Sequence, residues 1–526
     1  DPVAPGTAQL TLHASSRIGI VNRGEAAVRF IRGVKEYNSR YGTALKAVAI
    51  YTAREEQAPF VKNADDRVCF EDLKSFPGTA SSPYLDHELI LDALEAGGCD
   101  ALWVGWGFVS EDSLFAAKTE ERSLIFLGPS SDAMSRLGDK IAAKALAESS
   151  NVPILPWSRG AVESYEDAVR VSESIGYPVI VKASNAGGGR GIRFVLTPDQ
   201  LKSQYASAVD ETVRITGTRT VFIEHLVLRG RHLEVQVLAD THGTVNTFGV
   251  RDCSLQRRNQ KIIEETPPPG LSPEAIAEME AAAGRLISAA GYTGAGTVEY
   301  LYDLDSGRYF FMEVNTRLQV EHPITEELYG IDLVTGQIEV AFGQKVDLSM
   351  ASPRGHVMEA RLNAEDPGQD FSPAPGPVAL FRPPAGPGIR VDSGIETGAE
   401  IPPEFDSMVA KIIARGRDRN EALARLKRAL DECAIRIENG TTNRAFLRQL
   451  LDLPEVAAGG VSTGFVGELL ARGLSREPEH TSRAALITGA VTVARERFDE
   501  GQVNFQTELA RLGKPRSLPR GRGQEI

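Results

Sequence analysis

The hydrophobic pattern of the first 130 residues alternates between short apolar runs and amphipathic stretches. Apolar residues 18–21 are followed by a polar turn that contains Gly24, an amphipathic run from 26 to about 37 and a second apolar run at 44–51. A strand, a helix and a strand in so short a span are typical of a βαβ unit in a parallel sheet. The same pattern predicts strands at 101–104 and 124–127 and helices at about 84–96 and 131–149. We therefore predict an open α/β domain at residues 15–130, and the lack of a GxGxxG motif excludes a Rossmann dehydrogenase.

A glycine-rich loop separates two predicted strands in the next region. Residues 177–184 and 192–195 are predicted strands, and the loop between them contains Gly187, Gly188 and Gly189. Because the loop leads into a strand and lacks a GK[ST] ending, it is not a P-loop. A glycine hairpin can fold over phosphates as a lid, and Lys182 can reach a phosphate from the strand before it. A flexible hairpin with a surface lysine is the other interpretation that these residues allow.

Alternating polar and apolar residues predict further strands after the lid. Residues 221–224 and 232–238 fit this pattern, and the hinge between them can present backbone groups to a purine edge. A helix is expected at about 273–290. Three basic residues gather before a pair of glutamates, and they are Arg257, Arg258 and Lys261. This cluster fits a solvated surface and an anion site equally well.

Two carboxylates are expected to face each other across a β-hairpin. Predicted strands at 297–302 and 309–314 are joined by turn residues. If their pairing is symmetric about the turn, Glu299 lies opposite Glu313. Carboxylates at a cross-strand distance of roughly 5 Å repel each other unless a cation lies between them. Mg²⁺ prefers oxygen ligands, and Asn315 adds an amide oxygen on the same face, so we predict a metal site here.

The stretch 311–323 carries polar residues at every second position. In an extended segment they fall on one side, while Val314, Leu318 and Val320 fall on the other. A solvated strand face does not need such a row of carboxylate, amide and guanidinium groups. We predict one extended segment whose polar side carries chemistry, and its residues are Glu313, Asn315, Arg317, Gln319 and Glu321. Together with the glycine lid and the lysine, this segment indicates a nucleoside triphosphate site.

Composition limits the class of protein. The 526 residues are 42% hydrophobic and 25% charged, and no apolar run approaches the ~18 residues that a membrane span needs. A formal net charge of −13 argues against wholesale binding of nucleic acid, so a phosphate site must be local. The cysteines form no CxxC pair, which fits a reducing compartment and offers no structural zinc site. They are Cys69, Cys99, Cys253 and Cys433.

Six motifs match those of one known family. They are IVNRGE at 20–25, GDK at 138–140, KAS at 182–184 with its glycine loop, RDCSLQRR at 251–258, EVNTRLQVEHP at 313–323 and EARLNAEDP at 359–367. On these motifs, residues 15–465 resemble the biotin carboxylase component of biotin-dependent carboxylases, an ATP-grasp enzyme. The resemblance implies a fold of mixed α/β and α+β class. Its expected parts are an N-terminal open α/β domain at 15–130, an ATP-grasp domain at 131–350 with a mobile lid at about 150–230, and a mixed C-terminal domain at 351–465.

The resemblance also implies roles for individual residues. ATP would be bound by Lys140, Lys182, Gly187, Gly188, Gly189, Glu224, Val227, His232 and Gln256. Two Mg²⁺ or Mn²⁺ ions would be held by Glu299, Glu313 and Asn315. Bicarbonate would be held by Lys261, Arg317, Gln319, Val320 and Arg361, with Glu321 as the base. The implied reaction converts bicarbonate to carboxyphosphate, and N1 of biotin then captures CO₂ while Arg361 stabilises the biotin enolate.

The resemblance further indicates the partners of the chain. Asn259 stands where many members of the family have histidine, and it favours an acyl-CoA carboxylase of the acetyl- or propionyl-CoA type. Pyruvate and urea carboxylases remain alternatives. No methionine adjoins a lysine, so we expect biotin on a carrier domain outside this chain. The other expected partners are a carboxyltransferase domain or subunit and a second copy of the chain or a larger complex, in the cytoplasm or, in a eukaryote, the mitochondrial matrix.

The C-terminal third is less informative. Residues 372–388 are predicted as a Pro/Gly-rich loop, residues 419–432 as an amphipathic helix, and residues 466–526 as a helical extension with a basic linker. Two other functions stay open at this point. One is a different ATP-grasp carboxylate ligase, and the other is a non-catalytic nucleotide-binding scaffold of a larger carboxylase.

Overall fold

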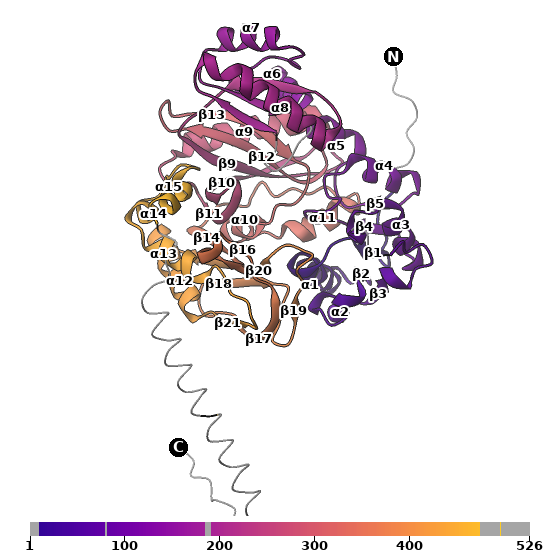
Figure 1. The fold of residues 1–526 in the computed structure, drawn as a ribbon. Helices are drawn as coiled ribbons and strands as arrows, with labels where there is room; N and C mark the ends of the chain where they lie inside the picture. The colour runs from indigo at the N-terminus through magenta and orange to yellow at the C-terminus, as the bar shows by residue number, and fades with distance from the viewer. Residues whose placement is uncertain (1–9, 79–81, 185–190, 474–494, 496–526) are drawn as a thin grey trace, which may run out of the picture. The chain divides into compact units, whose positions relative to one another are not determined.

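A computed structural model describes residues 10–78, 82–184, 191–473 and 495 (Figure 1). Residues 1–474 belong to one compact unit and residues 475–526 to another. The predicted glycine loop at 187–189 lies outside the described residues, as does the predicted C-terminal extension beyond residue 473, apart from residue 495. No helix among the described residues has the length and apolar character needed to cross a membrane.

The N-terminal region contains a parallel sheet with the strand order β3-β2-β1-β4-β5. Its strands are β1 (Arg17–Ile20), β2 (Lys46–Tyr51), β3 (Asp66–Cys69), β4 (Ala101–Trp103) and β5 (Ile125–Phe126). Its helices are α1 (Gly24–Tyr41), α2 (Pro59–Asn63), α3 (His87–Ala96) and α4 (Ser113–Glu121). The four predicted strands are confirmed. The pattern missed β3, because charged Asp66 and Arg67 make up half of this short strand.

The single helix predicted at 131–149 is wrong, because two helices occupy this stretch. They are α5 (Ser131–Gly138) and α6 (Lys140–Ser149). Between them Asp139 adopts an extended conformation with φ −77° and ψ 113°, and its carboxylate accepts hydrogen bonds from the N–H groups of Ile141 and Ala142. An aspartate that caps a helix in this way starts a new helix instead of continuing the old one.

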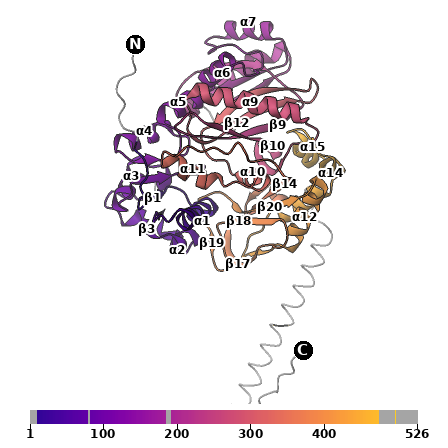
Figure 2. The ribbon, with the colours of Figure 1, turned by 180° about the vertical axis from the view of Figure 1, so that it is seen from behind.

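The lid region has its own small antiparallel sheet, with the order β7-β6-β8. Its strands are β6 (Val179–Ala183), β7 (Ile192–Val195) and β8 (Val221–His225), and its helices are α7 (Tyr165–Ile175) and α8 (Leu201–Thr216). Apolar residues between the sheet and the helices form a separate core. Both views place this region at one end of the unit, beside α6 (Figure 2).

A larger antiparallel sheet forms the centre of the unit, with the order β13-β12-β9-β10-β11-β14-β20-β18. Its strands are β9 (Gly230–Ala239), β10 (Val245–Arg257), β11 (Gln260–Thr266), β12 (Gly294–Asp303), β13 (Arg308–Asn315), β14 (His356–Asn363), β18 (Ile389–Ser393) and β20 (Met408–Gly416). Helix α9 (Pro273–Ala290), confirmed as predicted, packs on β9 and β10. Because β11 pairs with β14, the sheet continues across the expected domain boundary at residue 350.

In the hairpin of β12 and β13, Glu299 pairs with Glu313 as predicted, but the pairing arises from a bulge and not from a symmetric turn. Glu299 does lie opposite Glu313, but the pairing is not symmetric about the turn. Next to the turn Asp303 pairs with Arg308, and a shift in register follows between Glu299 and Tyr300. The extra residue on β13 at this bulge moves Glu313 into the position opposite Glu299.

The prediction of one extended segment at 311–323 is wrong beyond residue 315. Strand β13 ends at Asn315, residues 316–321 form an irregular connection, and α10 (His322–Tyr329) follows. Pro323 lies in the first turn of α10, where its missing N–H is not needed. The polar residues after Asn315 therefore reach the site from a folded connection and not from a strand face.

The Pro/Gly-rich stretch 372–388 is not the predicted loop, because it contains two strands. They are β16 (Ser372–Pro373), which pairs with β15 (Glu365–Asp366), and β17 (Gly376–Arg382), which pairs with β19 (Glu400–Ile401) and β21 (Ala434–Ile437). Val378 is buried, so β17 contributes to the core despite its neighbours Gly376 and Pro377.

The remaining helices are α11 (Leu333–Ala341), α12 (Arg419–Glu432, as predicted), α13 (Arg444–Asp452), α14 (Pro454–Ala458) and α15 (Phe465–Ala471). The short 3₁₀ helices are η1 (Ala53–Glu55), η2 (Phe70–Asp72), η3 (Pro83–Leu85), η4 (Pro198–Gln200) and η5 (Pro367–Gln369).

A buried ion-pair network joins α1, α10 and β18, which come from distant parts of the chain. Glu326 of α10 accepts from Arg29 of α1 at 2.9 Å and from Arg390 of β18 at 2.8 Å. Arg29 also pairs with Asp332 at 2.9 Å, and Arg390 with Asp392 at 2.7 Å. Burial alone would raise the pKa of Glu326, but the charges around it, that of Arg29 foremost, outweigh burial and lower the pKa to about 2.

We expect Glu326→Gln to lower the free energy of unfolding by about 3 kcal/mol at pH 7, because it leaves the buried Arg29 and the half-buried Arg390 without their shared charge. The folded-state pKa of Glu326 lies below its unfolded value, so this stabilisation is present above about pH 4.5 and is lost as the pH falls toward 2. Urea unfolding of the wild type and the variant across this pH range measures the difference.

Glu396→Gln is the matched control for this experiment. Glu396 also pairs across distant segments, with Lys62 at 3.2 Å, but about half of each side chain is exposed. An exposed pair of this kind contributes at most about 1 kcal/mol. Equal losses in the two variants would contradict a special role for the buried network.

Candidate active site

Four charged side chains form a row across neighbouring strands of the central sheet. Backbone pairing places Glu313 of β13 opposite Glu299 of β12, and Glu299 opposite Glu234 of β9. Glu234 in turn pairs with Arg251 of β10. Residues directly opposite each other across antiparallel strands point to the same side of a sheet. Three carboxylates and one guanidinium group therefore project side by side.

Glu234 and Arg251 are fully buried within this row. The Arg251 Nε donates to Glu234 Oε1 at 2.5 Å, and its Nη1 donates to Gln236 Oε1 at 2.6 Å. Two further hydrogen bonds, to the hydroxyl groups of Thr297 and Thr325, complete the surroundings of the guanidinium group. Arg251 is therefore held in one position and supplies a fixed positive charge beside the carboxylates.

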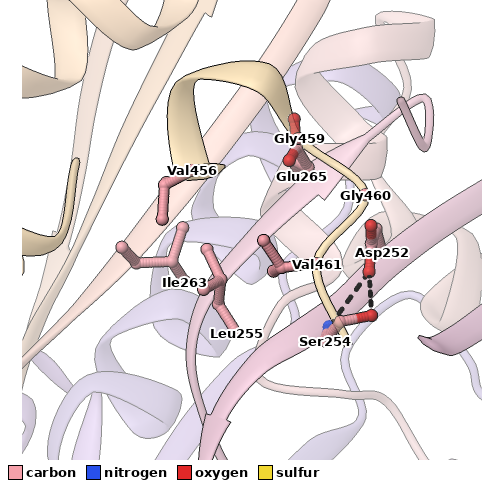
Figure 3. Close-up of a pocket in the computed structure, with 9 residues that line it drawn as sticks. All are labelled: Asp252, Ser254, Leu255, Ile263, Glu265, Val456, Gly459, Gly460 and Val461. Atoms are coloured by element: carbon pink, nitrogen blue, oxygen red, sulfur yellow. Dashed lines mark hydrogen bonds between the residues drawn. The ribbon is translucent and has the colours of Figure 1, made fainter. Parts of the chain in front are cut away.

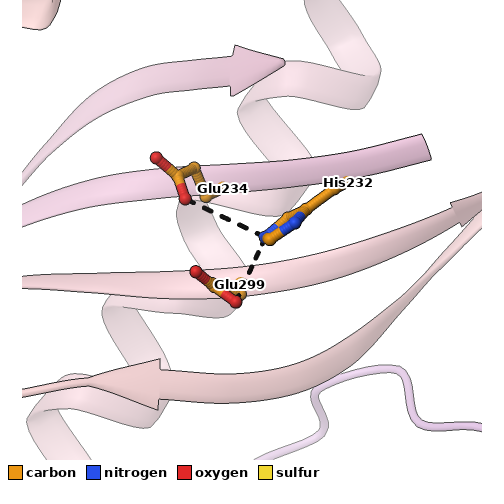
Figure 4. Close-up of side chains that lie close together, drawn as sticks. All are labelled: His232, Glu234 and Glu299. Atoms are coloured by element: carbon orange, nitrogen blue, oxygen red, sulfur yellow. Dashed lines mark ion pairs between the residues drawn. The ribbon is translucent and has the colours of Figure 1, made fainter. Parts of the chain in front are cut away.

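His232 lies against the same carboxylates (Figure 4). Its Nε2 is 3.1 Å from Glu299 Oε2 and 4.0 Å from Glu234 Oε2. Burial lowers the pKa of His232, but the interactions with Glu299 and Glu234 together outweigh burial, and the net effect is a raised pKa. The Nδ1 on the other side of the ring is 3.4 Å from Gln256 Nε2. His232 thus connects the carboxylate row to Gln256.

Lys261 of β11 is the cation at the centre of the site. Its Nζ lies 2.6 Å from Glu234 Oε2, 3.2 Å from Glu299 Oε1 and 2.6 Å from Glu321 Oε1. Burial alone would lower the pKa of Lys261, but the three carboxylates, Glu234 first among them, hold the pKa well above its usual value. One ammonium group therefore joins the strands β9, β11 and β12 to the connection before α10.

Glu321 is a fully buried carboxylate between two cations. One oxygen accepts from Lys261 at 2.6 Å, and the other accepts from Arg361 Nη2 at 2.8 Å. Although burial favours the neutral form, Lys261 and then Arg361 hold the pKa of Glu321 well below its usual range. Glu321 is therefore ionised at neutral pH, which is the state in which a carboxylate can accept a proton.

A pair of buried glutamates lies behind Arg361. Glu264 of β11 accepts from Arg361 Nε at 2.6 Å, and its backbone partner on β14 is Glu359. Neither carboxylate oxygen of Glu359 has a hydrogen-bond partner among the described residues. Burial raises the pKa of Glu264 to about 7 and that of Glu359 well above its usual value. Glu264 thus orients Arg361, while Glu359 is held in its neutral form.

The connection after β13 turns its polar side chains toward this centre. Arg317 Nη1 donates to Gln319 Oε1 at 2.8 Å, and Gln319 Nε2 donates to Glu299 Oε1 at 3.3 Å. Arg317 also pairs with Glu111 at 2.9 Å, so the N-terminal region contributes a carboxylate to the site. The carbonyl of Val320 accepts from the fully buried Lys411 at 2.8 Å. The predicted residues therefore converge even though the predicted strand does not extend this far.

The residues predicted to bind metal lie in register at one end of the row. Asn315 follows Glu313 two positions later on β13, and its Nδ2 is buried with no hydrogen-bond partner in the part of the chain that the structure describes. Lys140 of α6 lies 3.1 Å from Glu313 Oε2. Two carboxylates and an amide oxygen on one face match the oxygen ligands that Mg²⁺ prefers, so this donor set fits the ion. Among the described residues, two groups have three possible donor atoms within 4.8 Å of one another, and they are His232, Glu234 and Glu299, and Glu234, Cys253 and Glu321.

The residues predicted to bind the nucleotide fall into two groups. Lys140, His232 and Gln256 lie beside the carboxylate row. Lys182 instead pairs with the carboxylate of Glu224 in the lid sheet, where the pKa of Glu224 is about 2 because Lys182 and Lys144 outweigh the effect of burial. Val227 is half-buried in the connection between β8 and β9.

The basic cluster at 257–261 divides between two places. Arg257 and Arg258 both pair with Asp370, at 2.7 and 2.8 Å. Arg258 and Asn259 form the turn between β10 and β11, with φ values of 48° and 66°. Lys261 alone points into the site. The solvated interpretation therefore holds for Arg258, and the anion-site interpretation fits Lys261.

Neither of two cavities in the structure contains a predicted site residue. A cavity of about 10 Å³ lies where α14 and the chain after it cover β10 and β11, and it has room for about one water molecule (Figure 3). A larger cavity of about 260 Å³ lies between the N-terminal region and the segment around Gly394–Met408, and Arg23, Glu25 and Arg54 contribute to its wall. The charged side chains of the predicted site instead contact one another in ion pairs.

Several residues of the site were missed by the sequence analysis. Glu234 had a usable signal, because His232, Glu234 and Gln236 alternate with apolar residues along one strand. Glu111 and Lys411 had none, since they reach the site from distant regions of the chain. The others that were missed are Lys144, Arg251, Glu264 and Glu359.

Comparisons with known proteins identify the family of the chain. The chain matches three family models, described as the biotin carboxylase N-terminal domain at residues 14–134, the carbamoyl-phosphate synthase L chain ATP-binding domain at 139–349 and the biotin carboxylase C-terminal domain at 359–468. A biotin carboxylase of Nostoc is 41% identical over 455 residues, which cover 86% of this chain and 99% of that protein.

Two further relatives belong to particular carboxylases. The biotin-dependent acyl-coenzyme A carboxylase alpha3 subunit of Mycobacterium leprae is 43% identical over 427 residues, covering 80% of this chain and 69% of that protein. The crystal structure of the biotin carboxylase domain dimer of Hydrogenobacter thermophilus 2-oxoglutarate carboxylase, in complex with MgADP, ADP and bicarbonate, superimposes with a TM-score of 0.81. It is 34% identical and covers 90% of this chain and 100% of that one.

The length of these matches and their sequence identity establish the family of the chain. The chain belongs to the biotin carboxylases of biotin-dependent carboxylases, which are ATP-dependent ligases of the ATP-grasp fold.

Proposed function

We propose that this chain catalyses the first half-reaction of a biotin-dependent carboxylase, in which ATP and bicarbonate carboxylate biotin on a carrier domain. The observation that carries the proposal is the position of Glu321, buried between the ammonium group of Lys261 and the guanidinium group of Arg361. Two cations suit an oxyanion substrate, and a carboxylate at the same point suits a base. Membership of the biotin carboxylase family supports the same reaction.

Glu321 would remove the proton of bicarbonate as bicarbonate attacks the γ-phosphorus of ATP. Lys261, Arg317 and Arg361 would hold the bicarbonate oxygens, helped by Gln319 and the backbone of Val320. An anion that shares Lys261 and Arg361 weakens their hold on Glu321, so the pKa of Glu321 rises toward a value that suits a base. This attack gives ADP and carboxyphosphate, which decomposes to CO₂ and phosphate.

Lys140 and Lys182 would hold the phosphates of ATP under the glycines at 187–189. The backbone at Glu224 to Val227, with His232 and Gln256, would bind the nucleoside. Glu299, Glu313 and Asn315 would hold two Mg²⁺ or Mn²⁺ ions, which neutralise charge on the transferred phosphoryl group. The complex of the H. thermophilus relative with MgADP and bicarbonate supports a magnesium-bound adenine nucleotide and bicarbonate as the molecules that bind here.

Arg361 would serve the second step as well as the first. When biotin loses its N1 proton, the ureido oxygen becomes an enolate, and a buried guanidinium group is suited to stabilise that charge. Glu264 accepts from Arg361 Nε and Glu321 accepts from its Nη2, and these two bonds hold the guanidinium group in place. Biotin would arrive on a carrier domain outside this chain.

We further propose an acyl-CoA as the acceptor of the complete carboxylase. Asn259 supports this choice, as does the M. leprae acyl-coenzyme A carboxylase subunit among the relatives. The acceptor would be carboxylated on a carboxyltransferase partner, and the chain would work as a dimer or within a larger complex. Reconstitution with acetyl-CoA, propionyl-CoA, pyruvate or 2-oxoglutarate carboxyltransferases distinguishes the acceptors.

We expect Glu321→Gln to lower bicarbonate- and biotin-dependent ATP cleavage by at least about 100-fold, because glutamine accepts the same hydrogen bonds but cannot take a proton. ADP release with free biotin, with each substrate omitted in turn, measures this reaction. Glu327→Gln, at a partly exposed position in the last turn of α10, is expected to leave turnover unchanged.

Unchanged turnover in Glu321→Gln would reject Glu321 as the base. ATP binding by the wild type without any turnover that depends on bicarbonate and biotin would reject the enzymatic proposal and favour a scaffold.

We expect Glu313→Gln to raise the Mg²⁺ concentration needed for half-maximal activity by about tenfold or more, since the amide keeps an oxygen ligand but removes one negative charge. Titration of ATP cleavage with Mg²⁺ measures the change. Asp305→Asn removes an exposed carboxylate from the turn of the same hairpin and should leave the titration unaltered. An unaltered titration in Glu313→Gln would remove this residue from the metal site.

A further inference from the structure

Lys144 is a buried lysine that none of the proposed steps uses. It lies on α6, one turn after Lys140, and only 2% of the residue is exposed. Its Nζ is 2.5 Å from Glu224 Oε2 and 5.9 Å from the centre of the Trp157 ring. Burial lowers the pKa of Lys144 despite the nearby carboxylate. Lysine is rarely buried to this degree, so Lys144 is expected to have a specific role.

Glu224 carries two ammonium groups on one carboxylate. Lys144 binds Oε2, and Lys182 binds Oε1 from the neighbouring strand β6. The group of three therefore has one excess positive charge. Lys140 and Lys182 are the other cations that act on Lys144, so the positive charge gathers where α6 meets the lid sheet.

The two lysines on Glu224 differ in their access to solvent. The side chain of Lys182 is 19% exposed, whereas that of Lys144 is 3% exposed and lies beneath Glu224 and Trp157. Lys182 can therefore turn toward a phosphate, and Lys144 cannot. If Lys144 were absent, such a turn would leave the buried carboxylate of Glu224 without any partner, which is strongly unfavourable.

We propose that Lys144 is a positioning residue for nucleotide binding: it holds and neutralises Glu224 so that Lys182 is free to leave Glu224 and bind a phosphate of ATP. The inference rests on the proposed role of Lys182 as a phosphate ligand. It explains why a single carboxylate has two lysines, since one lysine neutralises Glu224 permanently and the other is shared between Glu224 and the nucleotide.

The test compares the affinities of the full chain for MgATP and for adenosine, by calorimetry without bicarbonate or biotin. We expect Lys144→Met to weaken MgATP binding on the order of tenfold, because Lys182 then stays on the unpaired Glu224. Adenosine binding should change little, because adenosine has no phosphate. Lys144→Arg should retain most of the MgATP affinity. In Lys144→Met with Glu224→Gln, the carboxylate is removed as well, and MgATP affinity should recover relative to Lys144→Met alone.

One control variant and three possible results separate this inference from its alternatives. Lys118→Met removes a partly exposed lysine that pairs with Glu88, and it should change neither affinity. Equal weakening of MgATP and adenosine by Lys144→Met, without recovery in the double variant, would show a purely structural role and overturn the inference. Weak MgATP binding in Lys182→Met but wild-type binding in Lys144→Met would also overturn it, while leaving the proposed function intact. Wild-type binding in Lys182→Met would reject the phosphate role of Lys182 and the inference with it.

Discussion

The ammonium group of Lys261 balances carboxylates that come from separate parts of the chain. Glu234, Glu299 and Glu321 lie on β9, on β12 and just before α10, and none of them is exposed by more than 5%. Buried carboxylates at such distances repel one another, so a compact site requires a shared cation. Lys261 supplies that charge, and β11, which carries it, also leads the sheet toward β14.

The pairing of β11 with β14 explains how one active centre draws on the whole unit. Arg361 and Glu264 meet across these strands, although about a hundred residues separate them in sequence. Glu111 and Lys411 reach the same centre from the N-terminal region and from β20. The network around Glu326 fixes α1 and β18 against α10, the helix that follows directly after Glu321. The position of the candidate base therefore depends on contacts from the N-terminal region and from strands across the central sheet.

Sequence reasoning predicted the parts of the site that depend on local pattern. Most strands and the helices at 273–290 and 419–432 follow from periodicity. The pairing of Glu299 with Glu313 was predicted from a symmetric hairpin, but it results from a bulge that the sequence did not indicate. The break at Asp139 and the start of α10 at His322 were missed, because a capping side chain and a proline overrode an otherwise regular pattern. Lys144 and Lys411 were missed because their roles come only from tertiary contacts. The roles of the site residues remain predictions, although the structure brings most of these residues together.

The bulge in β13 has a consequence for how the hairpin can vary in length. It separates the register near the turn from the register at Glu299 and Glu313. Insertions or deletions in the turn at 304–307 can be absorbed between the turn and the bulge, because the site end of the hairpin is also held by β9. Loss of Met312, the extra residue of the bulge, would restore regular pairing and leave Glu313 opposite Glu299. The tolerance of this hairpin to changes in length therefore includes the bulge itself, which lies directly beside the carboxylates.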